Sequence, residues 1–255
     1  MLLTVLGCSG SVPGPSSPAS GYLIEAGGAR IVVDLGNGTL GTLQQHADPL
    51  SLDALLLSHL HADHCADFSA LTVLRRYHPN PPVDPRAAKL PVYAPVEAPS
   101  RFAAQYAPDA AELAETDLSD VWDFRAWPVE ARINGIEVHP VRVAHPCEAY
   151  GLRLEHDGRT LAYTGDSGTC PALTELADGA DVLLAEASWT HAEDRPPDLH
   201  LSGREAGELA EAARVGRLIL THVPPWTDPD AVLEEAKAAY SGEVLLAEVS
   251  ARYEI

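Results

Sequence analysis

A dense group of histidine and aspartate side chains stands early in the chain, directly after a short apolar run. Residues 54–58 (Ala-Leu-Leu-Leu-Ser) have the nearly continuous apolar character of a buried β-strand. The segment that follows is His59-Leu60-His61-Ala62-Asp63-His64, which places four potential metal ligands together at the end of that strand. Imidazole and carboxylate groups suit zinc, and iron and manganese also accept them. A ligand set this dense can be divided between two ions, so the sequence predicts a dinuclear metal site.

The first half of the chain has the pattern of a β-sheet with helices. Gly and Pro residues separate short runs rich in β-forming residues, as is typical of adjacent strands. The pattern predicts strands at residues 2–6, 22–25, 31–34 and 54–58. It predicts helices at residues 38–46, 64–77 and 97–107. Five prolines between residues 78 and 91 predict an exposed loop without regular structure.

The second half of the chain repeats this pattern in kind. Strands are predicted at residues 137–143, 149–155, 160–164, 182–185, 218–221 and 244–247. A helix is predicted at residues 171–177. Ser202 with Glu205 forms a capping box that opens a helix through residue 214, and Asp228 before Pro229 opens another through residue 240. Two strand-rich halves with helices predict an α/β fold, a four-layer αββα sandwich.

The composition limits the size of the core and the kinds of partner. With 255 residues and 46% hydrophobic types, the chain can bury one large core, and we expect a single domain over residues 1–255. We expect a cytoplasmic protein, because no signal peptide pattern is visible and no apolar stretch reaches the roughly 20 residues of a membrane span. A formal net charge of -20 repels long polyanions, which disfavours long nucleic acids as partners. A homodimer is left open.

The four cysteines lie far apart in the sequence, at Cys8, Cys65, Cys147 and Cys170. Without Cys-x-x-Cys spacing they predict neither a thiolate zinc site nor a disulfide framework, so we expect reduced thiols. Cys65 adjoins His64, and Cys147 comes two residues after His145. Contact of either thiol with the metal site is therefore left open.

Five sequence elements, spread over nearly the whole chain, occur in a distinctive order. An Asp-x-Gly stands at residues 34–36, and the His-x-His-x-Asp-His motif follows at residues 59–64. A lone histidine, His145, comes next, then Thr-Gly-Asp at residues 164–166 and a histidine at the end of a strand, His222. In these elements and their order the chain resembles the metallo-β-lactamase superfamily.

The resemblance implies a role for each matched residue. The implied ligands are His59, His61 and His145 for one ion, Asp63, His64 and His222 for the other, and Asp166 as the bridge. The ions would be two zinc ions, or manganese or iron in their place. A hydroxide that bridges the two metals would be the nucleophile, because two cations stabilise hydroxide far better than solvent does. Asp34 would hold the histidine-rich loop as a hydrogen-bond acceptor.

A later segment resembles one branch of the superfamily, the ribonuclease Z-like phosphodiesterases. His200-Leu201-Ser202 precedes a capped helix as the His-Ser-Thr of that branch does, although its second and third letters differ. The resemblance implies that His200 stabilises the phosphoryl oxygens and protonates the departing alkoxide. Glu186 resembles the carboxylate that orients this histidine. With the ligand Asp63, these two complete the predicted catalytic residues.

The length of the segment between the third histidine and the bridging aspartate indicates the kind of substrate. Transfer-RNA-processing members of that branch carry a long basic arm between the third histidine and the bridging aspartate. Here only about 20 residues separate His145 from Asp166, enough for two strands and their turns. The resemblance therefore implies a dinuclear hydrolase whose partner is a small phosphodiester, such as a cyclic nucleotide.

Two other functions fit the same ligands. A carbonyl-directed hydrolase, such as a lactonase, a thioesterase or a β-lactamase-like enzyme, would not require the His200 segment. A metal-binding protein without turnover is a more remote alternative, because the ligand set is complete. Trp189 and Trp226 follow the Glu186 and His222 segments, where they either line the mouth of the site or pack inside the protein.

Overall fold

Two seven-stranded β-sheets form the centre of the protein. The computed structural model describes residues 1–127 and 130–255. The first sheet has the spatial order β14 (Arg252–Glu254), β1 (Leu2–Gly7), β2 (Gly21–Ala26), β3 (Ala29–Leu35), β4 (Ala54–Leu56), β5 (Leu90–Ala94) and β6 (Trp122–Ala126). The second has the order β13 (Glu243–Leu246), β12 (Arg217–Thr221), β11 (Val182–Glu186), β10 (Arg159–Tyr163), β9 (Tyr150–His156), β8 (Ile136–Arg142) and β7 (Ala131–Ile133). Each half of the chain supplies one sheet, except that β14 returns to pair with β1.

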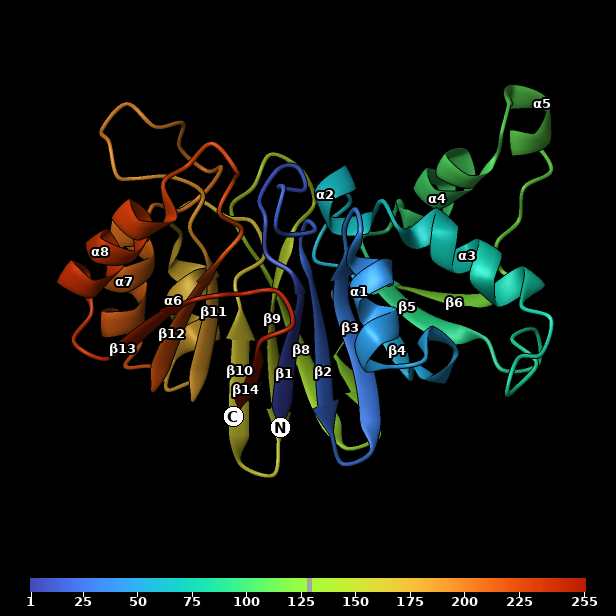
Figure 1. The fold of residues 1–255 in the computed structure, drawn as a ribbon, viewed down its shortest axis with the longest axis horizontal. Coiled ribbons are helices and arrows are strands. Elements are labelled where there is room, and N and C mark those ends of the chain that lie inside the picture. Colours follow the sequence, from blue (N-terminus) through green and yellow to red (C-terminus); the bar gives the residue numbers. More distant parts are fainter. Residues whose placement is uncertain (128–129) are drawn as a thin grey trace.

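Helices cover the outer face of each sheet (Figure 1). Against the first sheet lie α1 (Thr39–His46), α3 (Phe68–Tyr77) and α4 (Ala98–Tyr106). Against the second lie α6 (Pro171–Ala177), α7 (Gly203–Ala212) and α8 (Pro229–Ala239). This arrangement confirms the predicted four-layer αββα sandwich. Across the described ranges, none of the helices combines the length and the apolar character that a membrane crossing needs.

Strand side chains alternate between two apolar cores. In β1, Leu3 and Val5 face the opposite sheet, whereas Leu6 packs under the helices. In β2, Tyr22 faces the opposite sheet and Leu23 faces the helices. Both faces of these strands are covered, which explains why they appear as nearly continuous apolar runs in the sequence.

The predicted helix over residues 64–77 is interrupted, so that boundary is wrong. The chain forms α2 (Ala62–Cys65) and then α3. Between them the backbone N–H of Asp67 donates to the carbonyl oxygen of Leu35, and the Asp67 carboxylate accepts from the backbone N–H of Leu40. These contacts tie the junction to the first sheet and hold α2 as a separate turn.

The predicted loop over residues 78–91 ends too late, which is a second error. β5 begins at Leu90 and contains Pro91. Its ladder to β4 runs only through Val92 and Tyr93, so the missing N–H of Pro91 does not interrupt that pairing. The sequence patterns also do not predict β6 and several short elements, namely η1 (Pro49–Ser51), α5 (Ala110–Leu113), β7 and β14.

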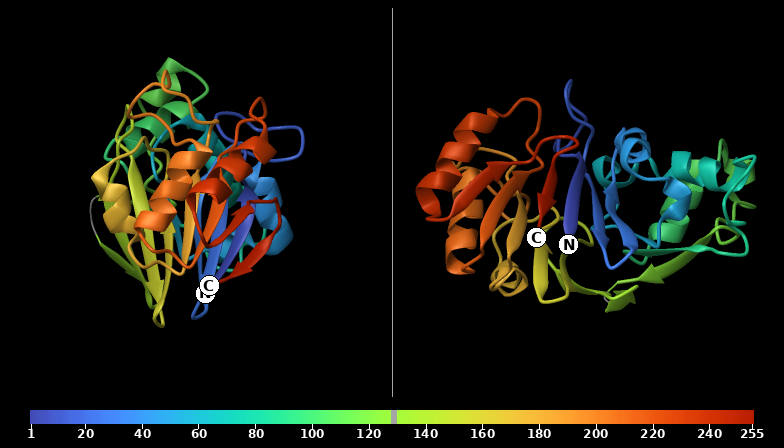
Figure 2. Two further views of the ribbon diagram at one scale, coloured as in Figure 1. Left: turned by 90° about the vertical axis from the view of Figure 1, so that its left-hand side faces the viewer. Right: turned by 60° about the horizontal axis from the view of Figure 1, so that its bottom comes forward.

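Parallel pairing directs several strands toward one end of the sandwich. β3 to β6 are parallel neighbours in the first sheet, and β10 to β13 are parallel neighbours in the second. Their carboxyl ends lie at the end of the molecule that carries α2 (Figure 1). The two chain termini lie side by side at the opposite end (Figure 2), where Met1 and Ile255 are hydrogen-bonded. Loops that follow the parallel strands are thus gathered far from the termini.

Candidate metal centre

All seven predicted ligands lie at this end of the sandwich, Asp63 and His64 on α2 and the other five on loops. The histidine-rich segment follows β4 and turns into α2. Asp166 follows β10, His222 follows β12, and His145 lies in the connection between β8 and β9. The end of a sheet where parallel strands present their carboxyl ends is a common place for binding sites. The fold therefore brings together side chains that are distant in sequence.

Two glycines of the matched motifs allow these loops to approach one another. A Cβ atom on Gly36 would lie 1.9 Å from the carbonyl oxygen of Asp63, so a larger residue would push the ligand loop away. Gly165 has a φ of 59°, and a Cβ atom on it would lie 2.7 Å from the carbonyl oxygen of Tyr150. Close backbone packing thus explains the glycines of Asp-x-Gly and Thr-Gly-Asp.

Three ring nitrogens converge in one half of the cluster. Nδ1 of His61 lies 3.0 Å from Nε2 of His59 and 3.2 Å from Nε2 of His145. Burial lowers the pKa of His59 and of His145, so both rings are neutral near pH 7. Three imidazole nitrogens held this close together have the arrangement that binds a shared cation.

Four buried side chains form the other half of the cluster. Nε2 of His222 lies 3.2 Å from Oδ2 of Asp63 and 3.4 Å from Oδ2 of Asp166. Asp166 also lies 3.1 Å from Nε2 of His64 and 3.7 Å from Nε2 of His59, so it stands between the two halves. Burial alone would raise the pKa of both carboxyl groups, but His222 and His64 more than offset it and hold each pKa below its usual range. Both carboxylates are therefore ionised.

The buried carboxylate of Asp34 holds the histidine-rich loop from behind. It accepts hydrogen bonds of 2.8 Å from Nδ1 of His64, from the backbone and hydroxyl of Ser58, and from the hydroxyl of Tyr163. The Ser58 hydroxyl in turn accepts from Nδ1 of His59 at 3.1 Å. Because Nδ1 is the donor in both of these contacts, Nε2 is the nitrogen that each ring turns toward the cluster.

Two further histidines are oriented in the same way. Nδ1 of His222 donates to the hydroxyl of Ser188 at 2.9 Å, and that hydroxyl donates to Oε2 of Glu186 at 2.8 Å. Nδ1 of His145 donates to the carbonyl oxygen of Leu199 at 2.9 Å. Ser188 is not among the predicted site residues, although two-residue alternation places residues 186 and 188 on the same side of an extended segment.

The donor set fits metal ions. Among the described residues, Nε2 of His64 and Oδ1 of Asp166 are buried without a hydrogen-bond partner, although they lie 3.1 Å apart. Buried polar atoms of this kind are costly unless something pairs with them. Asp34 and His222 have φ values of 56° and 57°, a strained conformation that concentrates at functional sites. These observations identify the cluster as the candidate metal centre.

His200 lies beside the cluster. Its ring centroid is 5.6 Å from that of His145 and 5.3 Å from that of His222. Nδ1 of His200 donates to Oε1 of the buried Glu186 at 2.9 Å. Burial alone would lower the pKa of His200, but Glu186 and Asp166 raise it to about 9. A positively charged imidazole is thus held next to the seven predicted ligands.

The structure separates the roles of the two cysteines near the site. All four cysteines are free thiols, as predicted. Sγ of Cys65 donates to the carbonyl oxygen of His61 at 3.2 Å, and burial raises its pKa to about 12, so it acts in packing. Sγ of Cys147 lies within 4.8 Å of ring nitrogens of His59, His61 and His145. Of these two thiols, Cys147 is therefore the one that reaches the cluster.

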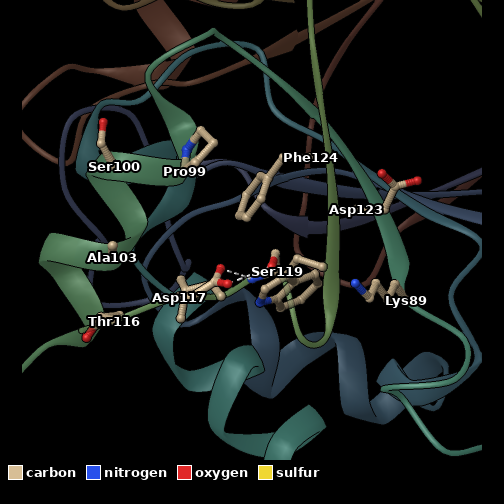
Figure 3. A pocket seen from close by; sticks show the side chains of 11 residues that line it. Lys89, Pro99, Ser100, Ala103, Thr116, Asp117, Ser119, Asp123 and Phe124 are labelled. Carbon is tan, nitrogen blue, oxygen red and sulfur yellow. Dashed lines mark hydrogen bonds between the residues drawn. The ribbon is translucent and has the colours of Figure 1, made fainter. Parts of the chain in front are cut away.

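Two hollows of similar volume differ in their relation to the cluster. One, of about 550 Å³, is lined in part by His200 and adjoins the candidate metal centre. The other, of about 560 Å³, lies between α4 and β6 and is lined by Phe124 with Asp117 and Lys89 on either side (Figure 3). The second hollow contains none of the predicted site residues, so it is separate from the chemistry described above.

The family assignment agrees with this geometry. The model of the β-lactamase superfamily domain matches residues 29–223 of the chain. The chain therefore belongs to the metallo-β-lactamase superfamily, as its motifs predict, and it is a ribonuclease Z-like member and a metal-dependent hydrolase.

Individual relatives cover almost the whole chain. An uncharacterized protein of Mycobacterium leprae is 52% identical over 95% of this chain and 84% of its own length. A ribonuclease Z of Mycolicibacterium paratuberculosis is 30% identical over 88% of this chain and 86% of its own. The crystal structure of the metallo-β-lactamase fold protein YhfI from Bacillus subtilis superposes with a TM-score of 0.84 at 27% identity, covering 100% of this chain and 98% of that one.

Proposed function

We propose that the protein is a dinuclear metal-dependent phosphodiesterase that hydrolyses a small phosphodiester such as a cyclic nucleotide. The proposed ligands are His59, His61 and His145 for one ion, Asp63, His64 and His222 for the other, and Asp166 between them. Zinc is the preferred metal, because the set combines imidazole with carboxylate groups. When bound, the two ions would supply Lewis acidity, which ionises water and neutralises phosphate charge.

The pair of His200 and Glu186 is the observation that carries the phosphodiesterase proposal. Phosphodiester hydrolysis needs a proton for the departing alkoxide and positive charge near the phosphoryl oxygens. His200 can supply both, because its pKa is raised to about 9 and its Nδ1 is fixed by Glu186 at 2.9 Å. Its other ring nitrogen is left to act on the substrate.

Asp63 has a second proposed role besides metal binding. Its side chain keeps 10% of its surface exposed, whereas those of His64 and His222 are almost completely buried. Oδ2 lies 3.2 Å from Nε2 of His222, on the side of the metal ligands. Oδ1 is the oxygen with which Asp63 would accept a hydrogen bond from the attacking water and orient it.

A small substrate is favoured over a long nucleic acid. The segment between His145 and Asp166 is occupied by β9 and β10 and carries no inserted arm. The formal net charge of -20 opposes the approach of a long polyanion. One relative bears the name ribonuclease Z, which agrees with phosphodiester chemistry at this kind of site.

A substrate panel tests the proposal. Initial rates are measured on bis(p-nitrophenyl) phosphate, cyclic nucleotides, a lactone and a thioester, with the metal content of the same preparation determined alongside. We expect the phosphodiesters to be hydrolysed with the highest kcat/KM. A preparation that contains metal but prefers the lactone or the thioester would assign the site to a carbonyl-directed hydrolase instead.

A further inference from the structure

A hollow lined by tryptophan opens directly beside His200. It has a volume of about 550 Å³, and its lining includes Trp189, Arg195, His200, Trp226 and Thr227. We call it the indole hollow. Because His200 belongs both to this lining and to the surroundings of the metal centre, a substrate whose reacting group lies at the ligands has the indole hollow as its neighbour.

The indole hollow offers an aromatic face to solvent. Trp226 is 68% exposed, the most exposed of the large hydrophobic side chains among the described residues. Trp189 stands in the same lining, with its ring edge-on to His200 at a centroid distance of 5.3 Å. Single exposed hydrophobic residues are common, but an exposed indole within a hollow at a catalytic histidine is suited to stacking on a planar ring.

The indole hollow contains a guanidinium group next to its aromatic rings. The Arg195 guanidinium lies over the Trp189 ring, with its Cζ atom 5.2 Å from the ring centroid. Arg195 is the one Arg or Lys in the described lining, which also contains one acidic side chain, Asp228. A guanidinium beside two indole rings favours an anion that carries an aromatic group.

We propose that the indole hollow is the base-binding subsite of the enzyme, in which the nucleobase of a small nucleotide phosphodiester stacks on Trp226. This proposal rests on the phosphodiesterase function proposed above and narrows its substrate to nucleotides. A nucleotide joins a planar ring to an anionic phosphorus centre through a short sugar, which matches an indole face next to His200. An aliphatic phosphodiester would leave that face without a partner.

The test removes the indole and the base in turn. The kcat/KM is measured for cyclic AMP and for its base-free analogue, in which hydrogen replaces adenine on the ribose, with wild type, Trp226→Ala, Trp226→Phe and Tyr77→Ala. Tyr77 is the control, because it is 65% exposed and lies on α3, outside the indole hollow. Stacking of a base on an aromatic side chain changes binding by about 5- to 100-fold.

We expect the ratio of kcat/KM for cyclic AMP to that for the base-free analogue to fall by about 5- to 100-fold in Trp226→Ala. Trp226→Phe should restore part of the ratio, and Tyr77→Ala should leave it at the wild-type value. An unchanged ratio in Trp226→Ala would overturn the base-binding subsite while the phosphodiesterase function stands.

A binding measurement keeps the two proposals separate. The affinities of AMP and of ribose phosphate are measured by calorimetry for wild type and Trp226→Ala. If wild type turns over neither cyclic substrate, the phosphodiesterase function fails. A preference for AMP that disappears in Trp226→Ala would still support the subsite, and equal affinities for both ligands in wild type would overturn it.

Discussion

Nδ1 of His200 donates a hydrogen bond of 2.9 Å to Oε1 of Glu186, whose side chain is buried. The same carboxylate accepts from the backbone N–H of Ser167 and from the hydroxyl of Ser188. Glu186 is therefore fixed by the loops that follow β10 and β11. The negative charge beside His200 is thereby built into the fold.

The first prediction concerns the pH dependence of turnover. Glu186 favours the protonated form of His200, whose pKa is about 9, so the active form is lost as the pH rises through that region. In Glu186→Gln the pKa of His200 should fall by about 1 to 3 units, which moves the basic limb of the pH–rate profile to lower pH. The control is Glu208→Gln, at an exposed glutamate paired with Arg204. An unmoved basic limb in Glu186→Gln would disprove the orienting role.

A second prediction separates ligands from the catalytic histidine. His61→Ala should lose bound metal, whereas His200→Ala should keep its metal and lose about 100-fold or more in phosphodiester turnover. His46→Ala is the control, since His46 lies at the end of α1 and pairs with Ser250, outside the cluster. Metal content is measured by elemental analysis after extensive dialysis. Equal metal loss in His61→Ala and His200→Ala would contradict the division of roles.

A third prediction concerns the support behind the ligands. Asp34→Asn removes the charge that holds His64 and Ser58, so metal affinity should fall by about 10- to 100-fold. The measurement is competition with a chelator of known affinity. The control is Asp157→Asn, at an aspartate whose side chain is 89% exposed. If Asp34→Asn binds metal as tightly as wild type does, the hydrogen bond from His64 has no part in metal binding.

A fourth prediction tests the packing of the first half. Phe68 on α3 is fully buried and stacks on Phe102 at a ring distance of 3.8 Å. Phe68→Ala should lower the free energy of unfolding by about 3 to 5 kcal/mol, measured by urea denaturation. Tyr77→Ala, on the same helix but exposed, should change it by no more than about 0.5 kcal/mol. Similar losses in both variants would show that α3 is not anchored through Phe68.

The strands buried on both faces are the part of the fold that the sequence predicts best. Residues 31–33 and 182–185 are apolar because helices cover one face of their strands and the opposite sheet covers the other. Such continuous apolar runs are visible in the sequence alone. β5 and the junction at Asp67 are different. Pro91 is tolerated in β5 because the ladder to the short strand β4 begins only at Val92. α2 is a separate turn because Asp67 is hydrogen-bonded to Leu35 and Leu40. Both features therefore depend on tertiary contacts.

The candidate site divides in a similar way. The converging histidines and aspartates can be found in the sequence, either in one dense motif or in motifs that follow a characteristic order. They stand out because few residue types can bind a metal ion. The residues that orient them are less visible. Tyr163 and Ser188 are ordinary residues of a strand and a loop until the fold places the first against Asp34 and the second against His222.

The number of metal ions per chain tests the central claim most directly. Zinc is titrated by calorimetry into protein that has been stripped with a chelator, and the bound metal is confirmed by elemental analysis. The convergence of six side chains around Asp166 predicts two ions per chain. A folded protein that binds only one ion, or that binds no zinc, manganese or iron, would contradict it.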